Sequence, residues 1–429
     1  MRDLLRLCTA GNVDDGKSTL IGRLLVDAGA VYADHIRAVA DASRHRGAGA
    51  LDYSLFTDGL KAEREQGITI DVAYRYFSTP RRAFILADTP GHEQYTRNMA
   101  TGASTADAAV LLVDARHGIR DQTRLHANIA RRMGVSTFIL AVNKMDLIGF
   151  DARVFTAIEA EFAALLPNVH RQAIPISARD GDNVASRSPR TPWYAGPHVL
   201  ESLEACPVGE QQVEAFRLPV QLVVRAPDFR GYAGQIASGD VRPGDSVTIW
   251  PTGQTAQIAR LVSEGGDLPV AHAPQSVTVT LAHDVDVGRG HVIAATPMTV
   301  TSRLSATVVW MDERGLDPAR VYVMKVGART VLAQADRRLA LNDLADITLT
   351  VAQPIAVDRY ADHRVTGSFI LVDPASCFTA GAGMIVAADP TTDSSSRLVA
   401  ADRLARTARG AASDEAAIEE IRKILEDIL

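Results

Sequence analysis

Gly11-Asn12-Val13-Asp14-Asp15-Gly16-Lys17-Ser18 is the stretch of this 429-residue sequence that decides the fold of its first part. Two glycines that are separated by four residues and followed by Lys and Ser fit a phosphate-binding loop when a strand precedes them and a helix follows. The apolar run 4–10 and the helix-like segment 19–28 supply that context. The sequence therefore predicts a strand, a tight loop and a helix start, whose backbone N–H groups point at phosphate oxygens.

This loop also carries side chains with expected roles in phosphate binding. We expect Lys17 to reach the β- and γ-phosphates and the Ser18 hydroxyl to hold Mg²⁺, with Thr19 beside it. A glycine turn that is followed by Lys and Ser by chance is the alternative, and the motif alone does not exclude it. Motifs further along the chain decide between the two interpretations.

Composition bounds the class of protein. The chain is too long for one core, which predicts two to four domains at roughly 100–200 residues each. It has 45 basic and 51 acidic residues, so its net charge of −6 argues against a protein whose whole surface binds nucleic acid. The cysteines have no close pairs and so suggest neither a disulfide framework nor a zinc site; Cys8 lies in an apolar run and is expected in the core. We find no signal-type segment and no apolar run of ~18 residues, so we expect a cytoplasmic protein without a membrane partner.

Two loops after the phosphate loop are typical of a nucleotide switch. Thr69 stands in Gly67-Ile68-Thr69-Ile70, where a switch loop would offer its hydroxyl to Mg²⁺ and the γ-phosphate. Asp88-Thr89-Pro90-Gly91-His92 follows the predicted strand 84–87, at the strand end where ligands bind in open α/β sheets. In this loop we expect Asp88 to reach the Mg²⁺ shell and the Gly91 N–H to meet the γ-phosphate.

His92 lies one residue beyond the expected phosphate contact. A histidine in this place can orient the attacking water and stabilise charge in the transition state, so we expect it to be catalytic. A surface histidine without a function is the alternative.

A base-recognition loop follows the predicted strand 137–142 as Asn143-Lys144-Met145-Asp146. The two oxygens of Asp146 can accept guanine N1–H and the N2 amino group, which adenine lacks, and such sites discriminate by about 10⁴–10⁵. Lys144 can lie along the base plane, and Asn143 can tie this loop to the phosphate loop. Ser177-Ala178-Arg179 follows the strand-like 174–176, and its backbone could meet guanine O6. The residues together predict binding of Mg²⁺ and GTP.

The order of patterns predicts a multidomain α/β + β protein. Strands and helices alternate over 1–207, which predicts a doubly wound, mainly parallel sheet in a P-loop GTPase domain. Short β-branched runs separated by turns then predict two small β-barrels, over 215–298 and 300–392. An apolar stripe predicts a C-terminal amphipathic helix over 413–429, which could dock on its own barrel or on a partner.

One polar cluster in the first barrel segment could suggest a metal site. It consists of His283, Asp284, Asp286 and His291. Its spacing matches no ligand pattern, so we interpret it as a solvated loop.

The motifs in this order resemble the translation-factor class of GTPases, with an elongation factor Tu-like architecture. Within that class the sequence is more similar to the GTPase (large) subunit of bacterial sulfate adenylyltransferase, and the likeness spans nearly the whole chain. The stretches that carry it are 11–25, 58–77, 91–99, 112–118 and 366–373. Of these, the stretches 74–77, 114–118 and 366–373 lean toward the sulfate enzyme. Asn12 departs from both patterns, since elongation factors have His there and this subfamily usually Ser.

The resemblance implies a partner and a coupled reaction. In that family the GTPase works with a separate, smaller adenylyl-transferring subunit, which makes adenosine 5′-phosphosulfate and pyrophosphate from ATP and sulfate. The product anhydride is of high energy, and GTP hydrolysis can pull its formation forward. Some relatives carry a C-terminal adenylylsulfate kinase domain, which we do not expect in this sequence.

The resemblance also implies roles for residues that match the family motifs. Residues 11–18 bind phosphates, Thr69 and Asp88 serve the metal, His92 assists water attack, and Asn143, Lys144 and Asp146 select guanine. Val13 and Ile68 match apolar positions that flank the histidine in elongation factors. Two other functions stay open at this point, an aminoacyl-tRNA carrier and a regulatory GTPase with another partner.

Overall fold

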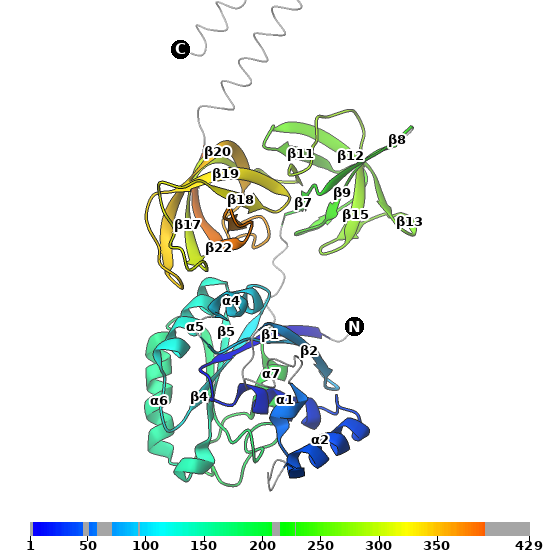
Figure 1. Ribbon diagram of the computed structural model, residues 1–429. Helices are drawn as coiled ribbons and strands as arrows, with labels where there is room; N and C mark the ends of the chain where they lie inside the picture. The colour runs from blue at the N-terminus through cyan, green and yellow to red at the C-terminus, as the bar shows by residue number, and fades with distance from the viewer. Residues whose placement is uncertain are drawn as a thin grey trace, which may run out of the picture. The chain divides into compact units, whose positions relative to one another are not determined.

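The computed structural model describes residues 3–45, 51–57, 71–92, 95–207, 215–227 and 229–390. The chain divides into two compact units, 1–212 and 213–429, which are described separately (Figure 1). Three of the predictions, for Thr69, Ile68 and the helix 413–429, lie outside the described residues.

The first unit is built on a six-stranded sheet with the strand order β2-β3-β1-β4-β5-β6. All neighbouring strands are parallel except β2, which runs antiparallel to β3. This confirms the mainly parallel sheet that the sequence predicts. The strands are β1 (Asp3–Gly11), β2 (Ala73–Ser78), β3 (Arg82–Asp88), β4 (Ala108–Asp114), β5 (Thr137–Asn143) and β6 (His170–Pro175).

The centre of this sheet is buried on both faces. Every residue of β4 and of β5 is buried, as expected for parallel strands that are covered by helices on either side. Cys8 lies in this core as predicted, and burial raises the pKa of its thiol to about 12. A rigid core of this kind holds the strand ends, and therefore the loops that follow them, at fixed positions.

Helices connect the strands and cover the sheet (Figure 1). The sequence predicts α1 within two residues of its observed bounds, whereas no pattern that we used predicts α6. The α-helices are α1 (Lys17–Asp27), α2 (Ala33–His45), α4 (Thr96–Ser104), α5 (Asp121–Arg132), α6 (Ala152–Leu165) and α7 (Val199–Ala205). Two 3₁₀ turns are η1 (Tyr53–Phe56) and η3 (Met145–Ile148).

The second unit begins with an eight-stranded antiparallel sheet around its own core. The predicted run 218–224 is two strands, because β7 pairs with β16 and the chain then turns to pair β8 with β9. A bridge joins Arg217 of β7 to Ser238, which lies shortly after β9 in the chain. The strands are β7 (Arg217–Pro219), β8 (Leu222–Ala226), β9 (Phe229–Gln235), β11 (Ser246–Trp250), β12 (Gln254–Ser263), β13 (Gly266–Asp267), β15 (Ser276–Leu281) and β16 (Val292–Ala294). A separate pair is β10 (Asp240–Val241) and β14 (Ala271–His272).

The remaining strands form a closed barrel with the order β17-β20-β19-β18-β21-β22. Closure removes the exposed edges of a sheet, which stabilises a small all-β domain against mispairing. The strands are β17 (Thr299–Trp310), β18 (Tyr322–Val326), β19 (Arg329–Ala335), β20 (Leu344–Val357), β21 (Ser368–Val372) and β22 (Thr379–Asp389).

A buried ion pair links the two β-rich parts of the second unit. Arg217 Nε lies 3.1 Å from a carboxylate oxygen of Asp358, and the side chains are 3% and 10% exposed. Thr366 donates to the same carboxylate at 2.6 Å. Thr366 opens the stretch 366–373 that leans toward the sulfate enzyme, so part of that resemblance reflects how the two β-rich parts are joined.

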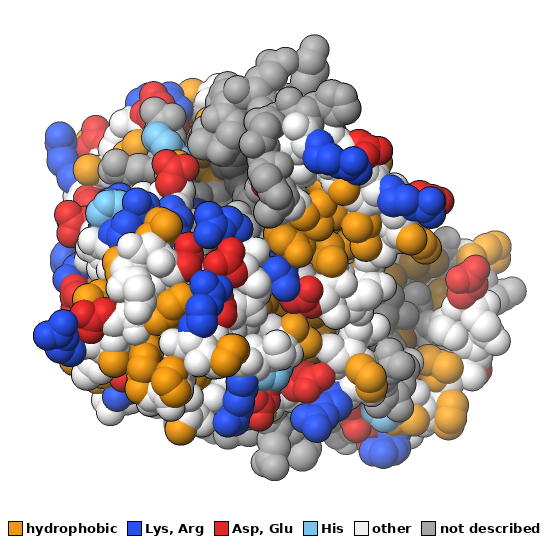
Figure 2. All heavy atoms as spheres, turned by 90° about the horizontal axis from the view of Figure 1, so that it is seen from below, with side chains coloured by type: hydrophobic (Ala, Val, Ile, Leu, Met, Phe, Trp, Pro, Cys, Tyr) orange, Lys and Arg blue, Asp and Glu red, His pale blue; other side chains and the backbone are white. Residues whose placement is uncertain are grey.

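The surface carries charges of both signs side by side (Figure 2). Many are exposed arginine–aspartate pairs, such as Arg37–Asp34 and Arg260–Asp267, each at 2.8 Å. Such exposed pairs contribute little to stability. In the predicted polar cluster His283, Asp284 and Asp286 are exposed, as expected of a solvated loop. Within the described ranges no helix combines the length and the hydropathy that a bilayer crossing requires.

Candidate nucleotide-binding site

The carboxyl ends of the parallel strands bring the predicted motifs together. Thr9 of β1 pairs with Asp88 of β3, and Asp114 of β4 pairs with Asn143 of β5. The phosphate loop continues from β1 between them. Register alone therefore places the phosphate loop, the loop after Asp88 and the base-recognition loop at one edge of the sheet.

The phosphate loop is held open by its own backbone. Gly16 has φ of 97° and directly precedes α1, and Asp14 also has a positive φ. A Cβ at Gly16 would lie 2.3 Å from Asn143 Nδ2, so glycine is required there for space as well as for conformation. The Asn12 N–H donates to Asp15 Oδ2 at 2.8 Å, and burial raises the pKa of Asp15. The Asn12 backbone is thus held by a side chain of the same loop.

Lys17 lies inside the loop rather than in solvent. It is 7% exposed, and its Nζ donates to the carbonyls of Gly11 at 3.2 Å and Asn12 at 2.7 Å. Burial lowers the pKa of Lys17, and the negative charges of Asp88 and Asp15 oppose this shift. A buried cation in the loop that directly precedes a helix N-terminus is an arrangement that favours a phosphate group.

The loop after β3 packs directly on the phosphate loop. Asp88 is 2% exposed, and its Oδ1 accepts a 3.4 Å hydrogen bond from the Thr9 hydroxyl. Thr89 donates to the Thr9 carbonyl, and Pro90 is buried. A Cβ at Gly91 would lie 2.2 Å from Lys17 Nζ, so only glycine allows this close approach.

His92 lies at the outer side of this loop. It is partly exposed, its ring centroid is 6.0 Å from that of Tyr95, and its carbonyl accepts from the Tyr95 N–H at 3.0 Å. His92 follows Gly91, whose backbone lies close to Lys17, and its catalytic role stays a prediction.

Asn143 ties three loops together. Its Nδ2 donates to the Asp15 carbonyl at 2.8 Å, which is the tie to the phosphate loop that the sequence predicts. Its Oδ1 accepts from the Ala178 N–H at 2.9 Å. Met145 is fully buried, and its N–H bonds to the Ile176 carbonyl at 3.2 Å. The loops that carry Asp146 and Ala178 are thus fixed relative to the phosphate loop.

The base-recognition side chains are paired with arginine. Asp146 is 11% exposed in its side chain, and its Oδ2 lies 3.2 Å from Arg179. Arg179 also contacts Asp180 at 3.0 Å, and the Asp180 N–H donates to the buried Ser177 hydroxyl at 3.3 Å. The carboxylate that the sequence predicts to bind guanine is therefore in contact with Arg179.

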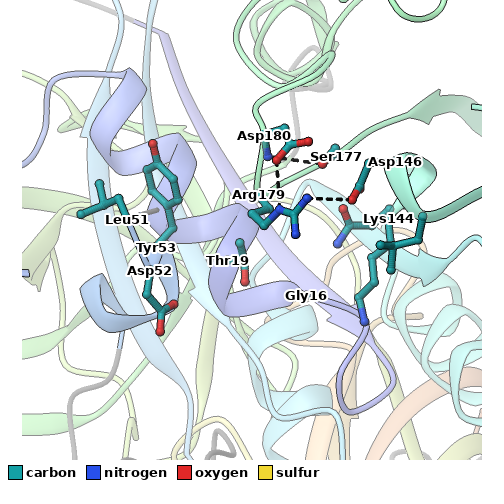
Figure 3. A pocket seen from close by; sticks show the side chains of 12 residues that line it. Gly16, Thr19, Leu51, Asp52, Tyr53, Lys144, Asp146, Ser177, Arg179 and Asp180 are labelled. Atoms are coloured by element: carbon teal, nitrogen blue, oxygen red, sulfur yellow. Dashed lines mark hydrogen bonds and ion pairs between the residues drawn. The ribbon is translucent and has the colours of Figure 1, made fainter. Parts of the chain in front are cut away.

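A cavity of about 730 Å³ lies between these loops, which is the size of a small-molecule site (Figure 3). Figure 3 shows Leu51, Asp52 and Tyr53 across the cavity from Asp146. The lining residues are Gly16, Thr19, Leu51, Asp52, Tyr53, Asn143, Lys144, Asp146, Leu147, Ser177, Arg179 and Asp180.

The wall formed by residues 51–53 was not predicted. A Cβ at Gly22 would lie 1.9 Å from the Tyr53 carbonyl, so the absent side chain lets η1 pack on α1. Arg23 of the same helix lies 4.8 Å from the Tyr53 ring centroid. A glycine inside a helix, followed by arginine, is the sequence signal that could have pointed to this contact.

The donor atoms near the phosphate loop fit Mg²⁺. Ser18 supplies a hydroxyl and Asp88 a carboxylate, which are the hard oxygen donors that Mg²⁺ prefers. Among the described residues no group of three or more His, Cys, Asp or Glu could hold a metal alone.

Known proteins match over the same regions. The family model of the elongation factor Tu GTP binding domain matches residues 2–226, and that of the GTP-eEF1A C-terminal domain matches 330–386. Sulfate adenylyltransferase subunit 1 of Laribacter hongkongensis is 48% identical, over 94% of this chain and 89% of its own. That of Methylorubrum extorquens is 50% identical, over 90% and 87%. The bifunctional enzyme CysN/CysC of Mycobacterium tuberculosis is 48% identical, over 90% of this chain and 68% of its own.

Proposed function

The chain belongs to the family of sulfate adenylyltransferase subunit 1, and we propose on that premise that it is the GTP-hydrolysing subunit of a sulfate adenylyltransferase. One observation carries the proposal. A single cavity joins Gly16 and Thr19 at its phosphate end to Asp146 at its base end. Its two ends match the two ends of a guanosine triphosphate.

The residues around this cavity have separate roles in the binding and hydrolysis of GTP. Residues 11–18 bind the phosphates, Asp146 selects guanine, and the backbone of 177–179 meets guanine O6. Ser18 and Asp88, together with Thr69, would hold Mg²⁺, whose charge would offset that of the phosphates. His92 orients the water whose oxygen attacks the γ-phosphorus, while the bond to the bridging β–γ oxygen breaks.

GTP hydrolysis in this chain drives a reaction in a second subunit. The proposed partner is a smaller adenylyl-transferring subunit, which forms adenosine 5′-phosphosulfate and pyrophosphate from ATP and sulfate. Because the phosphosulfate anhydride is of high energy, its formation needs a coupled source of free energy. We further propose that the complex works in the cytoplasm. The names of the relatives favour this function over the carrier and regulatory alternatives.

A coupling assay tests the proposal. The full chain is mixed with an adenylyl-transferring subunit, ATP, sulfate and Mg²⁺, and the yield of adenosine 5′-phosphosulfate is measured. We expect GTP to raise the yield and a non-hydrolysable GTP analogue to leave it at the level without GTP. Equal yields with GTP and the analogue would contradict the coupling. Co-purification gives a second test, since tRNA in place of a protein subunit would favour a carrier.

A further inference from the structure

Asp114 is a buried carboxylate beside the base-recognition loop, in a stretch to which no site motif assigns a role. It ends β4, pairs in register with Asn143 and is 2% exposed. A buried carboxylate is costly unless it is paired, so its partners define what it does. Two cations contact it, Lys144 and Arg116.

The two cations contact Asp114 in different ways. Arg116 makes a two-pronged contact, with Nε at 3.0 Å and a terminal nitrogen at 2.6 Å, and its side chain is 44% exposed. Lys144 lies 3.0 Å from Asp114 Oδ2 and lines the nucleotide cavity. Burial would raise the pKa of Asp114, but the hydrogen bonds from Arg116 and Lys144 together lower it well below its usual range. The carboxylate is therefore a stable anchor for both cations.

Lys144 is held from its other side by the phosphate loop. Its Nζ donates to the Asp14 carbonyl at 2.6 Å, and Figure 3 shows the side chain extending toward the loop that carries Gly16. A lysine side chain is a flexible four-carbon stem, so one contact alone does not set its direction. Asp114 and the Asp14 carbonyl together hold it along the cavity wall.

We propose that Asp114 is a positioning residue for guanine nucleotide binding, which acts by holding Lys144 between the base site and the phosphate loop. The inference rests on the proposed function. Without the carboxylate, nucleotide binding would have to order the lysine stem, and ordering one long side chain on binding lowers affinity. Asp114 thereby links the two ends of the cavity through one lysine.

The alternative is that Asp114 only stabilises the turn after β4. The N–H groups of His117 and Gly118 bond to its main-chain carbonyl at 2.9 Å and 3.0 Å, which a change of side chain leaves in place. Its carboxylate also accepts from the Arg116 N–H at 2.9 Å. A role in the turn would therefore act through Arg116, whereas the proposed role acts through Lys144.

A double-mutant cycle separates these roles. The dissociation constant for GDP binding to the protein, with Mg²⁺ present, is measured by calorimetry for the parent, Asp114→Asn, Lys144→Met and the double variant. Arg116→Met is the matched control. We expect Asp114→Asn to weaken binding roughly tenfold in the parent and by less than about twofold when Lys144 is already Met. Arg116→Met should stay within about twofold of the parent. Thermal unfolding without nucleotide verifies that each variant folds.

Each outcome decides the inference. An equal loss from Asp114→Asn in both backgrounds, or a tenfold loss from Arg116→Met, would overturn the positioning role. If Asp114→Asn does not fold, the same cycle is run with Asp114→Glu, which keeps the charge but displaces it, and a loss that depends on Lys144 is again expected. If the parent protein does not bind GDP, the proposed function is contradicted instead.

Discussion

The two ends of the nucleotide cavity are built in different ways. At the phosphate end the contacts are made by a strained backbone and buried groups, and Lys17 is 7% exposed. At the base end they are made by side-chain ion pairs, and the Arg179 side chain that contacts Asp146 is 63% exposed. A backbone cradle accepts any polyphosphate, whereas one carboxylate distinguishes one base from another. The comparison teaches that affinity and selectivity are located in separate parts of one site.

A substitution next to the phosphate end should change the rate of GTP hydrolysis without changing the affinity for GTP. We expect His92→Ala to slow GTP hydrolysis by about 10²–10⁴, because a positioned group that assists proton transfer or water attack contributes that much. Affinity for GTP should change little, since the proposed role of His92 is to orient the attacking water and not to bind the nucleotide. Single-turnover hydrolysis and calorimetry measure the two effects, with His170→Ala, an exposed histidine at the start of β6, as the control. Unchanged turnover would remove His92 from the mechanism.

The phosphate end should govern affinity for every nucleoside triphosphate. We expect Lys17→Met to weaken the binding of GTP and xanthosine triphosphate alike, by roughly 10² or more, since truncating one member of a buried charge pair costs about 2–5 kcal/mol. Lys325→Met changes an exposed lysine of β18 and serves as the matched control. A loss confined to GTP would show that the two ends are not independent.

The base end should govern which base the site binds. We expect Asp146→Asn to weaken GTP binding by about 10² and to favour xanthosine triphosphate, because the 2-oxo group of that base needs a donor. Asp180→Asn is the matched control, since Asp180 contacts the same arginine. Competition between the two nucleotides gives the ratio, and an unchanged ratio in Asp146→Asn would refute the placement of guanine.

The burial of a histidine near the phosphate end should also make the stability of the protein depend on pH. His126 of α5 is fully buried, its Nε2 lies 2.9 Å from Gln122 Nε2, and burial together with the charge of Lys17 lowers its pKa from 6.5 to about 3. Between these values the unfolded chain binds a proton that the folded chain excludes, so stability falls as pH falls. From pH 7 to pH 5 the loss should be about 2 kcal/mol.

A neutral side chain at this position should remove that loss. We expect the free energy of unfolding of His126→Gln to change less over the same interval, since glutamine does not titrate. Denaturant unfolding of the first unit at several pH values provides the measurement. If the free energy of unfolding depends on pH in the same way in the variant and the parent, then His126 is protonated in the folded protein as readily as in the unfolded chain.

Much of the fold is readable because strand and loop patterns are local. The runs 108–113 and 138–142 are apolar throughout and lie within β4 and β5, while Pro and Gly occur in the loops that follow β1 and β3. Helix α6 escaped prediction because no motif falls on it. The split of the run 218–224 into β7 and β8 depends on two different partner strands, and no local pattern specifies a partner.

The sequence by itself determined which chemical groups this protein has and in what order, because a phosphate loop or a base-recognition loop is a short stretch whose conformation follows from its own residues. Only the tertiary structure decided that Tyr53 walls the cavity, that Arg179 contacts Asp146 and that Asp114 holds Lys144. The physical reason is register. Which side chains meet depends on how strands distant in the sequence align, and that alignment is set by the packing of the whole core.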